Sequence, residues 1–165
     1  MPTGLLKDIA RQIPRNVALL GLDVGVKTIG LALSDPAQSI ATPLHTIKRT
    51  KFTKDILELD GIIREFEIGG YVLGLPVNMG GSEGRRAQSI RDFAQEMNNH
   101  PKIFGADPFI AFWDERLSTV SVEEFVDKSV GKRKTKANAK SSGLIDKLAA
   151  QVILQGALDF LANQS

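Results

Sequence analysis

Residues 17–34, VALLGLDVGVKTIGLALS, decide the fold, because they hold two apolar runs separated by a short turn. The runs at 17–22 and 29–33 have strand length and are rich in Leu, so we predict a β-hairpin of buried strands. Asp23 closes the first strand, and the turn holds it near Gly25 and the ammonium of Lys27. A carboxylate here either accepts hydrogen bonds in the turn or serves a functional site. The hairpin alone leaves both possibilities open.

A second acidic residue, Glu115, follows another buried strand, PFIAFW at 108–113. Side chains alternate along a strand, so Asp114 and Glu115 leave opposite faces of the sheet. A strand that is apolar on both faces is central, and functional sites tend to lie at the ends of such strands. The alternative is a surface ion pair with Arg116, which the sequence leaves open for Asp114.

The third acidic residue, Asp146, opens a helix predicted over 144–162, directly after the capping segment 141–143. A carboxylate at this end of a helix can simply complement the helix dipole. However, the residues three, four and seven positions on are small or apolar: Ala149, Ala150 and Ile153. Asp146 therefore shares the stripe that faces the core, where a cation would offset its desolvation cost. Asp23, Glu115 and Asp146 are our candidate metal site.

The composition limits the chemistry that this chain can perform. Its 165 residues suffice for one well-packed domain, and 42% hydrophobic and 24% charged residues are ordinary for a soluble protein. We expect no membrane segment and no secretion signal, and the absence of cysteine fits a cytoplasmic protein. His45 and His100 are far in sequence from the acidic residues, so a histidine triad or zinc site is not expected. Carboxylates must carry any chemistry.

Positive charge is concentrated between residues 128 and 140, KSVGKRKTKANAK, although the formal net charge is only +2. A basic run of this kind is either a solvated linker or a nucleic-acid contact. We interpret it as a contact with a phosphate backbone, because it leads directly into the helix of Asp146. The residues expected to make this contact are Lys132, Arg133, Lys134 and Lys136.

A glycine-rich loop, NMGGSEG at 78–84, joins a strand at 71–76 to a helix predicted over 85–98. Glycines let a backbone approach phosphates closely. Arg85 and Arg86 lie at the N-terminus of this helix, where the dipole disfavours cations, so a bound anion explains them better than helix stability does. The loop lacks the GK[ST] ending of a nucleotide-binding P-loop, and by itself it is a weak signal.

The order of elements predicts an α/β domain with a mixed central sheet flanked by helices on both faces. A third strand is expected at 41–47, and further helices at 52–66 and near 120–128. Residues 17–165 then form a single domain. Residues 1–16 are expected to be a loosely attached arm or a short helix.

Four blocks in this order resemble the YqgF/RuvX family of RNase H-like nucleases: GLDVGVKTIGLALSD, VLGLPVNMGGSEGRRAQSIRDFA, DERLSTVSVEE and DKLAAQVILQ. The resemblance implies an RNase H-like fold and a cytoplasmic bacterial protein. It also implies a role in trimming the 5′ end of pre-16S rRNA in ribosome biogenesis, or in resolving Holliday junctions. The family's carboxylates map onto Asp23, Glu115 and Asp146.

From these residues we expect metal-assisted phosphodiester hydrolysis. Oxygen ligands without His or Cys favour Mg²⁺ or Mn²⁺, and two ions are expected, with Asp23 bridging them. The residues expected to position phosphates are Lys27, Arg85, Arg86 and Arg116. The expected partners are pre-rRNA, pre-ribosomal particles or branched DNA, and the expected state is a monomer or a weak dimer. Whether Asp114 assists Glu115 stays open.

Two rival interpretations belong to other functional classes. The segment DVGVKTIG at 23–30 also resembles the first phosphate loop of actin-like ATPases, but those enzymes need two such domains and this chain has room for one. The stronger rival is a non-catalytic RNA-binding factor of ribosome assembly, in which the acidic residues serve structure.

Overall fold

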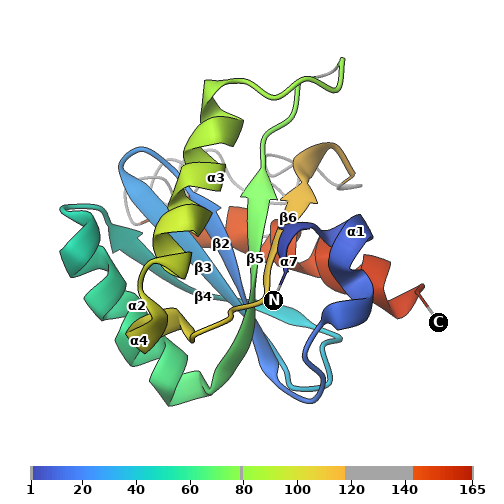
Figure 1. Ribbon diagram of the computed structural model, residues 1–165, viewed down its shortest axis with the longest axis horizontal. Coiled ribbons are helices and arrows are strands. Elements are labelled where there is room, and N and C mark those ends of the chain that lie inside the picture. The colour runs from blue at the N-terminus through green and yellow to red at the C-terminus, as the bar shows by residue number, and fades with distance from the viewer. Residues whose placement is uncertain (1, 79, 118–142, 165) are drawn as a thin grey trace.

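The computed structural model describes residues 2–78, 80–117 and 143–164, which contain one six-stranded sheet with helices on both faces (Figure 1). The strands are β1 (Thr3–Leu5), β2 (Ala18–Val24), β3 (Thr28–Ser34), β4 (Ala41–Lys48), β5 (Ile68–Leu75) and β6 (Ile110–Asp114). Their order across the sheet is β1-β6-β5-β2-β3-β4. The first four of these are parallel, whereas β3 is antiparallel to both β2 and β4. The predicted mixed α/β sheet is confirmed.

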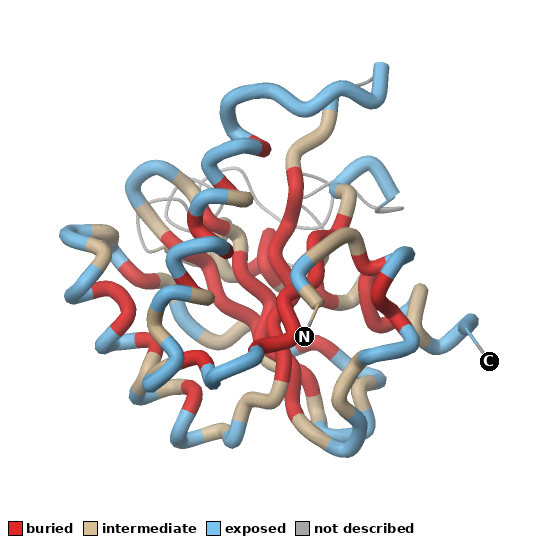
Figure 2. The backbone as a smooth tube through the Cα atoms, viewed as in Figure 1, coloured by how far each residue is buried: buried red, intermediate tan, exposed pale blue. Residues whose placement is uncertain are grey.

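Helices cover the sheet in two layers, each over its own hydrophobic core. One core packs α2 (Phe52–Phe66), α3 (Arg85–Asn98) and α4 (Pro101–Phe104) against side chains such as Leu22 and Phe112. The other packs α1 (Leu6–Ile9) and α7 (Leu144–Ala162) against Leu19 and Trp113. The central strands between these layers are buried almost throughout (Figure 2). No helix in the described ranges is both long and apolar enough to cross a bilayer.

The expected helices at 52–66, 85–98 and 144–162 have the observed bounds of α2, α3 and α7. The expected hairpin is β2 with β3, and the third strand is β4. Strand β5 begins at Ile68, three residues earlier than expected, because Ile68 pairs with Ala18 at the start of β2. The helix expected near 120–128 lies outside the described residues.

The short helix allowed for residues 1–16 is observed as α1, but the segment is not a loosely attached arm, because its strand β1 is part of the sheet. Strand β1 pairs in parallel with β6, with Leu5 opposite Phe112. The short helix α1 that follows buries Leu6 and Ile9 in the same core as α7. Three strand residues are too few to show an alternating pattern, which is why the sequence did not reveal β1.

Candidate active site

The three acidic residues lie at the end of the sheet where the parallel strands β2, β5 and β6 have their C-termini. Asp23 is the second-last residue of β2, and Glu115 follows β6 in the 3₁₀ turn Glu115–Leu117. Along β2, Leu19 belongs to the core under α7, so Asp23, four residues later, faces the same side. Trp113 likewise places Glu115 on the side of α7. In parallel α/β sheets, this end is where sites usually form.

Gly74 in the central strand β5 makes room for the carboxylate of Glu115. A Cβ atom added to Gly74 would lie 2.8 Å from Glu115 Oε1, and it would also collide with Ile153 of α7. Glu115 is exposed overall, but its carboxylate lies against Gly74, in the space that a side chain at position 74 would fill. Because β5 separates β2 from β6, this contact brings Glu115 towards Asp23.

Asp146 reaches the site because a second glycine lets helix α7 touch the sheet. Gly30 of β3 is the sheet partner of Asp23. A Cβ atom on Gly30 would overlap the backbone carbonyl of Asp146, so only glycine allows this approach. The start of α7 is also held by β4, since the hydroxyl of Thr46 donates a 2.7 Å hydrogen bond to the Gly143 carbonyl. The first turn of α7 therefore lies over the end of β2.

The electrostatics show that the charges of Glu115 and Asp146 act on Asp23. Burial, followed by the charges of Glu115 and Asp146, raises the pKa of Asp23 to about 6, against the opposing effect of Arg86. Burial also raises the pKa of Glu115, while Arg86 lowers it and Asp114 raises it. A pKa near 6 means that negative charge at Asp23 is poorly compensated in the protein alone. A bound cation would supply that compensation.

The carboxylates of Asp23, Glu115 and Asp146 have no hydrogen-bond or ion-pair partner within residues 2–78, 80–117 and 143–164. The turn after Asp23 closes through its own backbone instead, with Gly25 N–H donating to the Thr28 carbonyl at 2.8 Å. The role of a turn acceptor, which the sequence left open for Asp23, is therefore not observed. No described residue buries a polar side-chain atom without a partner, so these carboxylates are accessible to solvent and to a cation.

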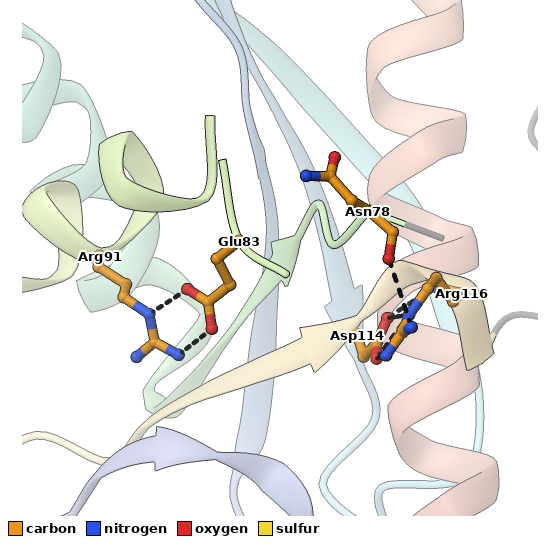
Figure 3. Close-up of polar contacts among 5 residues, drawn as sticks. All are labelled: Asn78, Glu83, Arg91, Asp114 and Arg116. Carbon is orange, nitrogen blue, oxygen red and sulfur yellow. Dashed lines mark hydrogen bonds and ion pairs between the residues drawn. The ribbon is translucent and has the colours of Figure 1, made fainter. Parts of the chain in front are cut away.

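Asp114, by contrast, already has its partner. Its carboxylate accepts hydrogen bonds from the Arg116 guanidinium at 2.7 and 3.1 Å and from the Arg116 backbone N–H at 2.9 Å (Figure 3). These contacts hold the pKa of Asp114 below its usual range. The ion pair considered for Asp114 in the sequence is thus present, and Asp114 is not equivalent to Glu115.

The four expected phosphate contacts outside the basic segment have different surroundings. Arg86, exposed near the N-terminus of α3, is close enough to lower the pKa of both Asp23 and Glu115. Lys27 and Arg85 are exposed and form no ion pair with any described residue. Arg116 is engaged by Asp114 and reaches the Asn78 carbonyl at 3.4 Å. Lys132, Arg133, Lys134 and Lys136 lie outside the described residues.

The sequence did not reveal Arg49, which supports the turn after Asp23. Its guanidinium donates a 2.6 Å hydrogen bond to the Gly25 carbonyl, and its backbone N–H donates to the Lys27 carbonyl at 2.9 Å. The guanidinium also lies 5.6 Å from the centre of the Phe93 ring. No local pattern marks an arginine after a strand as a turn support, so only the tertiary contacts show this role.

The same loop region contains a second feature that the sequence did not reveal, a bidentate ion pair between Glu83 and Arg91. Its two hydrogen bonds measure 2.7 and 2.8 Å and tie the glycine-rich loop to helix α3 (Figure 3). Arg116 holds the other side of the loop through Asn78. Two arginines therefore fix the loop that precedes Arg85 and Arg86.

The donor chemistry of the site fits a hard divalent cation, since all three side chains offer carboxylate oxygens. The described residues contain no group of three or more His, Asp or Glu side chains already gathered tightly enough to hold an ion. The acidic residues are therefore coupled by charge without forming a closed cage. A cation could bind these carboxylates, which have no partner among the described residues, and it would offset the effects that raise the pKa of Asp23.

Comparisons with known proteins find relatives over nearly the whole chain. A protein from Rhodospirillum centenum named "Putative pre-16S rRNA nuclease" is 49% identical over 94% of this chain and 80% of its own length. One of the same name from Rhodobacter capsulatus is 50% identical over 96% of this chain and 93% of its own. Among solved structures, Thermus thermophilus RuvC, in complex with a Holliday junction substrate, matches with a TM-score of 0.52 and 15% identity.

The RuvC match covers 89% of this chain and 96% of RuvC, and at this identity it shows the fold alone, which is RNase H-like as expected. A family model described as "RuvX: Holliday junction resolvase" matches residues 17–160. That range contains all three acidic residues, the two arginines at the start of α3 and the whole sheet except β1. By this match and by its close relatives, the chain belongs to the RuvX (YqgF) family.

Proposed function

We propose that this protein is a metal-dependent nuclease that hydrolyses phosphodiester bonds at the edge of the sheet formed by β2, β5 and β6. The observation that carries the proposal is a set of three carboxylates on one face, from β2, from the end of β6 and from α7, which have no partner among the described residues. Burial of Asp23 and the charges of Glu115 and Asp146 raise the pKa of Asp23 to about 6, and a purely structural role gives no reason to place these charges together.

Asp23, Glu115 and Asp146 would hold the cations, Mg²⁺ or Mn²⁺, through their carboxylate oxygens. When bound, such ions lower the pKa of a water molecule and neutralise the charge that develops on phosphate oxygens. The protein's own contribution is orientation: Gly74 and Gly30 leave the space in which the carboxylates of Glu115 and the backbone of Asp146 approach Asp23. Burial of Asp23 strengthens its interaction with a cation.

The cationic side chains near the acids would hold the phosphate backbone of the substrate. Arg86 is the best placed, because its charge already acts on Asp23 and Glu115. Lys27 and Arg85 are exposed and unpaired within the described residues, so both are available to an anion. The basic segment at 128–140 would extend this contact along the strand.

The substrate that we propose is the 5′ end of pre-16S rRNA. The names of relatives that are 49–50% identical support RNA, whereas the junction-bound RuvC structure is only 15% identical. A four-way DNA junction is the second candidate, supported by the description of the family. A symmetric dimer would be needed for paired cuts in a junction, and we expect a monomer or a weak dimer.

The test is cleavage of a 5′-extended 16S rRNA precursor and of a matched four-way DNA junction, with Mg²⁺ or with EDTA. We expect Mg²⁺-dependent cleavage of the RNA by wild type, loss of cleavage in Asp146→Asn, and retained binding in both. Asp159→Asn is the matched control, because Asp159 is exposed near the far end of the same helix. Binding without metal-dependent cleavage of either substrate would favour a non-catalytic assembly factor. The mass in solution, measured alongside, reports the oligomeric state.

Metal binding can be tested without a substrate. Millimolar Mg²⁺ should raise the melting temperature of wild type, because the ion binds the native state only, and Asp23→Asn should abolish this rise. Differential scanning calorimetry or circular dichroism measures the shift. An unchanged wild-type melting temperature would count strongly against the metal site.

A further inference from the structure

A cavity of about 380 Å³ lies beside the acidic residues, at the point where β1 ends. Strand β1 stops at Leu5, which pairs with Phe112, whereas β6 continues for two more residues. The outer edge of β6 at Trp113 and Asp114 is therefore left without a neighbouring strand. Residues Leu5, Leu6 and Lys7 form one side of the resulting cavity.

The walls of this cavity are apolar and partly aromatic. They include Leu75, Phe112, Trp113, Leu117 and Phe160, which come from both faces of the sheet. Leu117 is 55% exposed, so part of its side chain is open to a ligand. Flat apolar groups fit such walls, because stacking on them removes apolar surface from water.

The charged residues that line the cavity cancel one another. Lys7 and Arg116 oppose Glu83 and Asp114. Both carboxylates already form ion pairs, Asp114 with Arg116 and Glu83 with Arg91 (Figure 3). Because these charges balance, the cavity offers little net attraction to a phosphate. An uncharged group with hydrogen-bonding edges can still bind by hydrogen bonds. Paired carboxylates keep free acceptor positions, and the five donors of Arg116 are not all used.

The cavity lies at the same end of β6 as the proposed active site, because Asp114 and Arg116, which line it, are the residues on either side of Glu115. A nucleic-acid strand whose phosphate lies at Asp23 and Glu115 would bring a neighbouring nucleotide to this opening. The lining therefore has the chemistry of a nucleobase site, and its position is one that a substrate strand would reach.

We propose that this cavity binds a nucleobase of the substrate, from a nucleotide adjacent to the scissile phosphate. The base stacks on the apolar wall next to Leu117, and its N–H groups donate to the carboxylates of Glu83 and Asp114. The proposal rests on the proposed nuclease function for the class of ligand, but binding of the base requires neither a metal ion nor cleavage.

Trp113 can serve as an intrinsic fluorescence probe of the cavity, because it lines the cavity and is the only tryptophan in the sequence. We expect at least one of AMP, GMP, CMP and UMP to change the fluorescence of Trp113 in EDTA. Ribose 5-phosphate, which has the same phosphate and no base, should leave it unchanged. Asp23→Asn should respond as wild type does, which separates this site from the metal site.

Two exposed leucines provide a matched pair of variants. Leu117→Glu places a charge at the mouth of the cavity and should raise the apparent Kd of the nucleotide about tenfold. Leu57→Glu makes the same change at a residue that is 65% exposed on α2 and should change the Kd less than about twofold. Both substitutions are on the surface, so both variants should fold.

A third measurement uses an oligonucleotide substrate with single abasic positions on either side of the cut. Loss of the base at one of these positions should weaken binding to wild type, measured in EDTA. Loss of the same base should not weaken binding to Leu117→Glu any further. The proposal is overturned if no mononucleotide alters Trp113 fluorescence, if ribose 5-phosphate alters it equally, or if every abasic position is neutral. Cleavage without base binding would overturn only this proposal, and base binding without cleavage would overturn only the nuclease function.

Discussion

At the scale of single residues, the site is defined by which carboxylates have partners. Asp114 and Glu115 are neighbours in the chain, yet Asp114 is satisfied by Arg116 while Glu115 lies over Gly74 with no partner among the described residues. The alternation of a strand places these two side chains on opposite sides. The ion pair with Arg116 therefore distinguishes Asp114 from Glu115, which pairs with no described residue.

The raised pKa of Asp23 predicts a pH dependence of stability in the metal-free protein. The folded pKa, about 6, lies above the ordinary value of 3.8, so between these values the folded state binds the proton and the unfolded state does not. Stability contributed by this proton is present below about pH 4 and is lost as pH rises through 6. At pH 7, in EDTA, Asp23→Asn should therefore be more stable than wild type by up to about 3 kcal/mol.

Urea unfolding of both proteins between pH 4 and 7 checks this prediction. The difference between wild type and Asp23→Asn isolates Asp23, because carboxylates such as Asp35 and Glu83, whose pKa is lowered, change stability with pH in the opposite direction in both proteins. A difference that stays constant with pH would mean that Asp23 has an ordinary pKa.

At the scale of elements, helix α7 is placed by glycines in the sheet rather than by its own cap. Its N-cap is Gly143, with φ of +79°, and no capping side chain is bound there. Gly21 and Gly30 form the flat part of the sheet on which the helix packs. A Cβ atom on Gly21 would be 2.7 Å from Leu154 Cβ, which is too close. The small residues of α7 complete this close approach, with Ala150 and Ala157 fully buried.

Gly30→Ala should displace α7 and with it Asp146. We expect a loss of at least about 2 kcal/mol in the free energy of unfolding, because the new Cβ atom would overlap the backbone carbonyl of Asp146. A backbone group cannot move aside as a flexible side chain can. The control is Gly61→Ala in helix α2, where a Cβ atom meets nothing within 4 Å. That change should stabilise the protein by about 0.5–1 kcal/mol. Denaturant unfolding measures both, and equal effects would contradict the close contact.

At the scale of the whole molecule, the N-terminal segment closes the edge of the sheet next to the site. It pairs with β6, and Leu6 is 1% exposed in the core shared with α7. The family match begins only at residue 17, so this strand lies outside the matched region. The sheet nevertheless depends on it, because β6 would otherwise have a free edge.

Leu6→Ala tests this dependence. Removing a fully buried leucine should lower the free energy of unfolding by roughly 2–4 kcal/mol, if residues 2–12 are integral to the fold. Leu57→Ala, at an exposed position, should change it by less than about 0.5 kcal/mol. If both variants unfold at the same denaturant concentration, the N-terminal segment is the loose arm that the sequence suggested.

The sequence by itself determined the local elements and the faces of their residues. Helix and strand periods placed α2, α3 and α7, and alternation put Asp114 and Glu115 on opposite faces of their strand. Helical spacing put Asp146 on the stripe of Ala149, Ala150 and Ile153, which faces the core. These properties follow from the geometry of a few consecutive residues, so they can be read from a single chain. The resemblance of the motifs pointed to the same three carboxylates.

Only the tertiary structure decided which elements are neighbours. Residues 23, 115 and 146 lie at the same end of the sheet because β5 lies between β2 and β6 and because glycines admit α7, and neither fact leaves a local periodic pattern. The same holds for β1 and for the support of the Gly25 turn by Arg49. Long-range contacts depend on the whole packing of the chain, and the period of one segment carries no information about its partner.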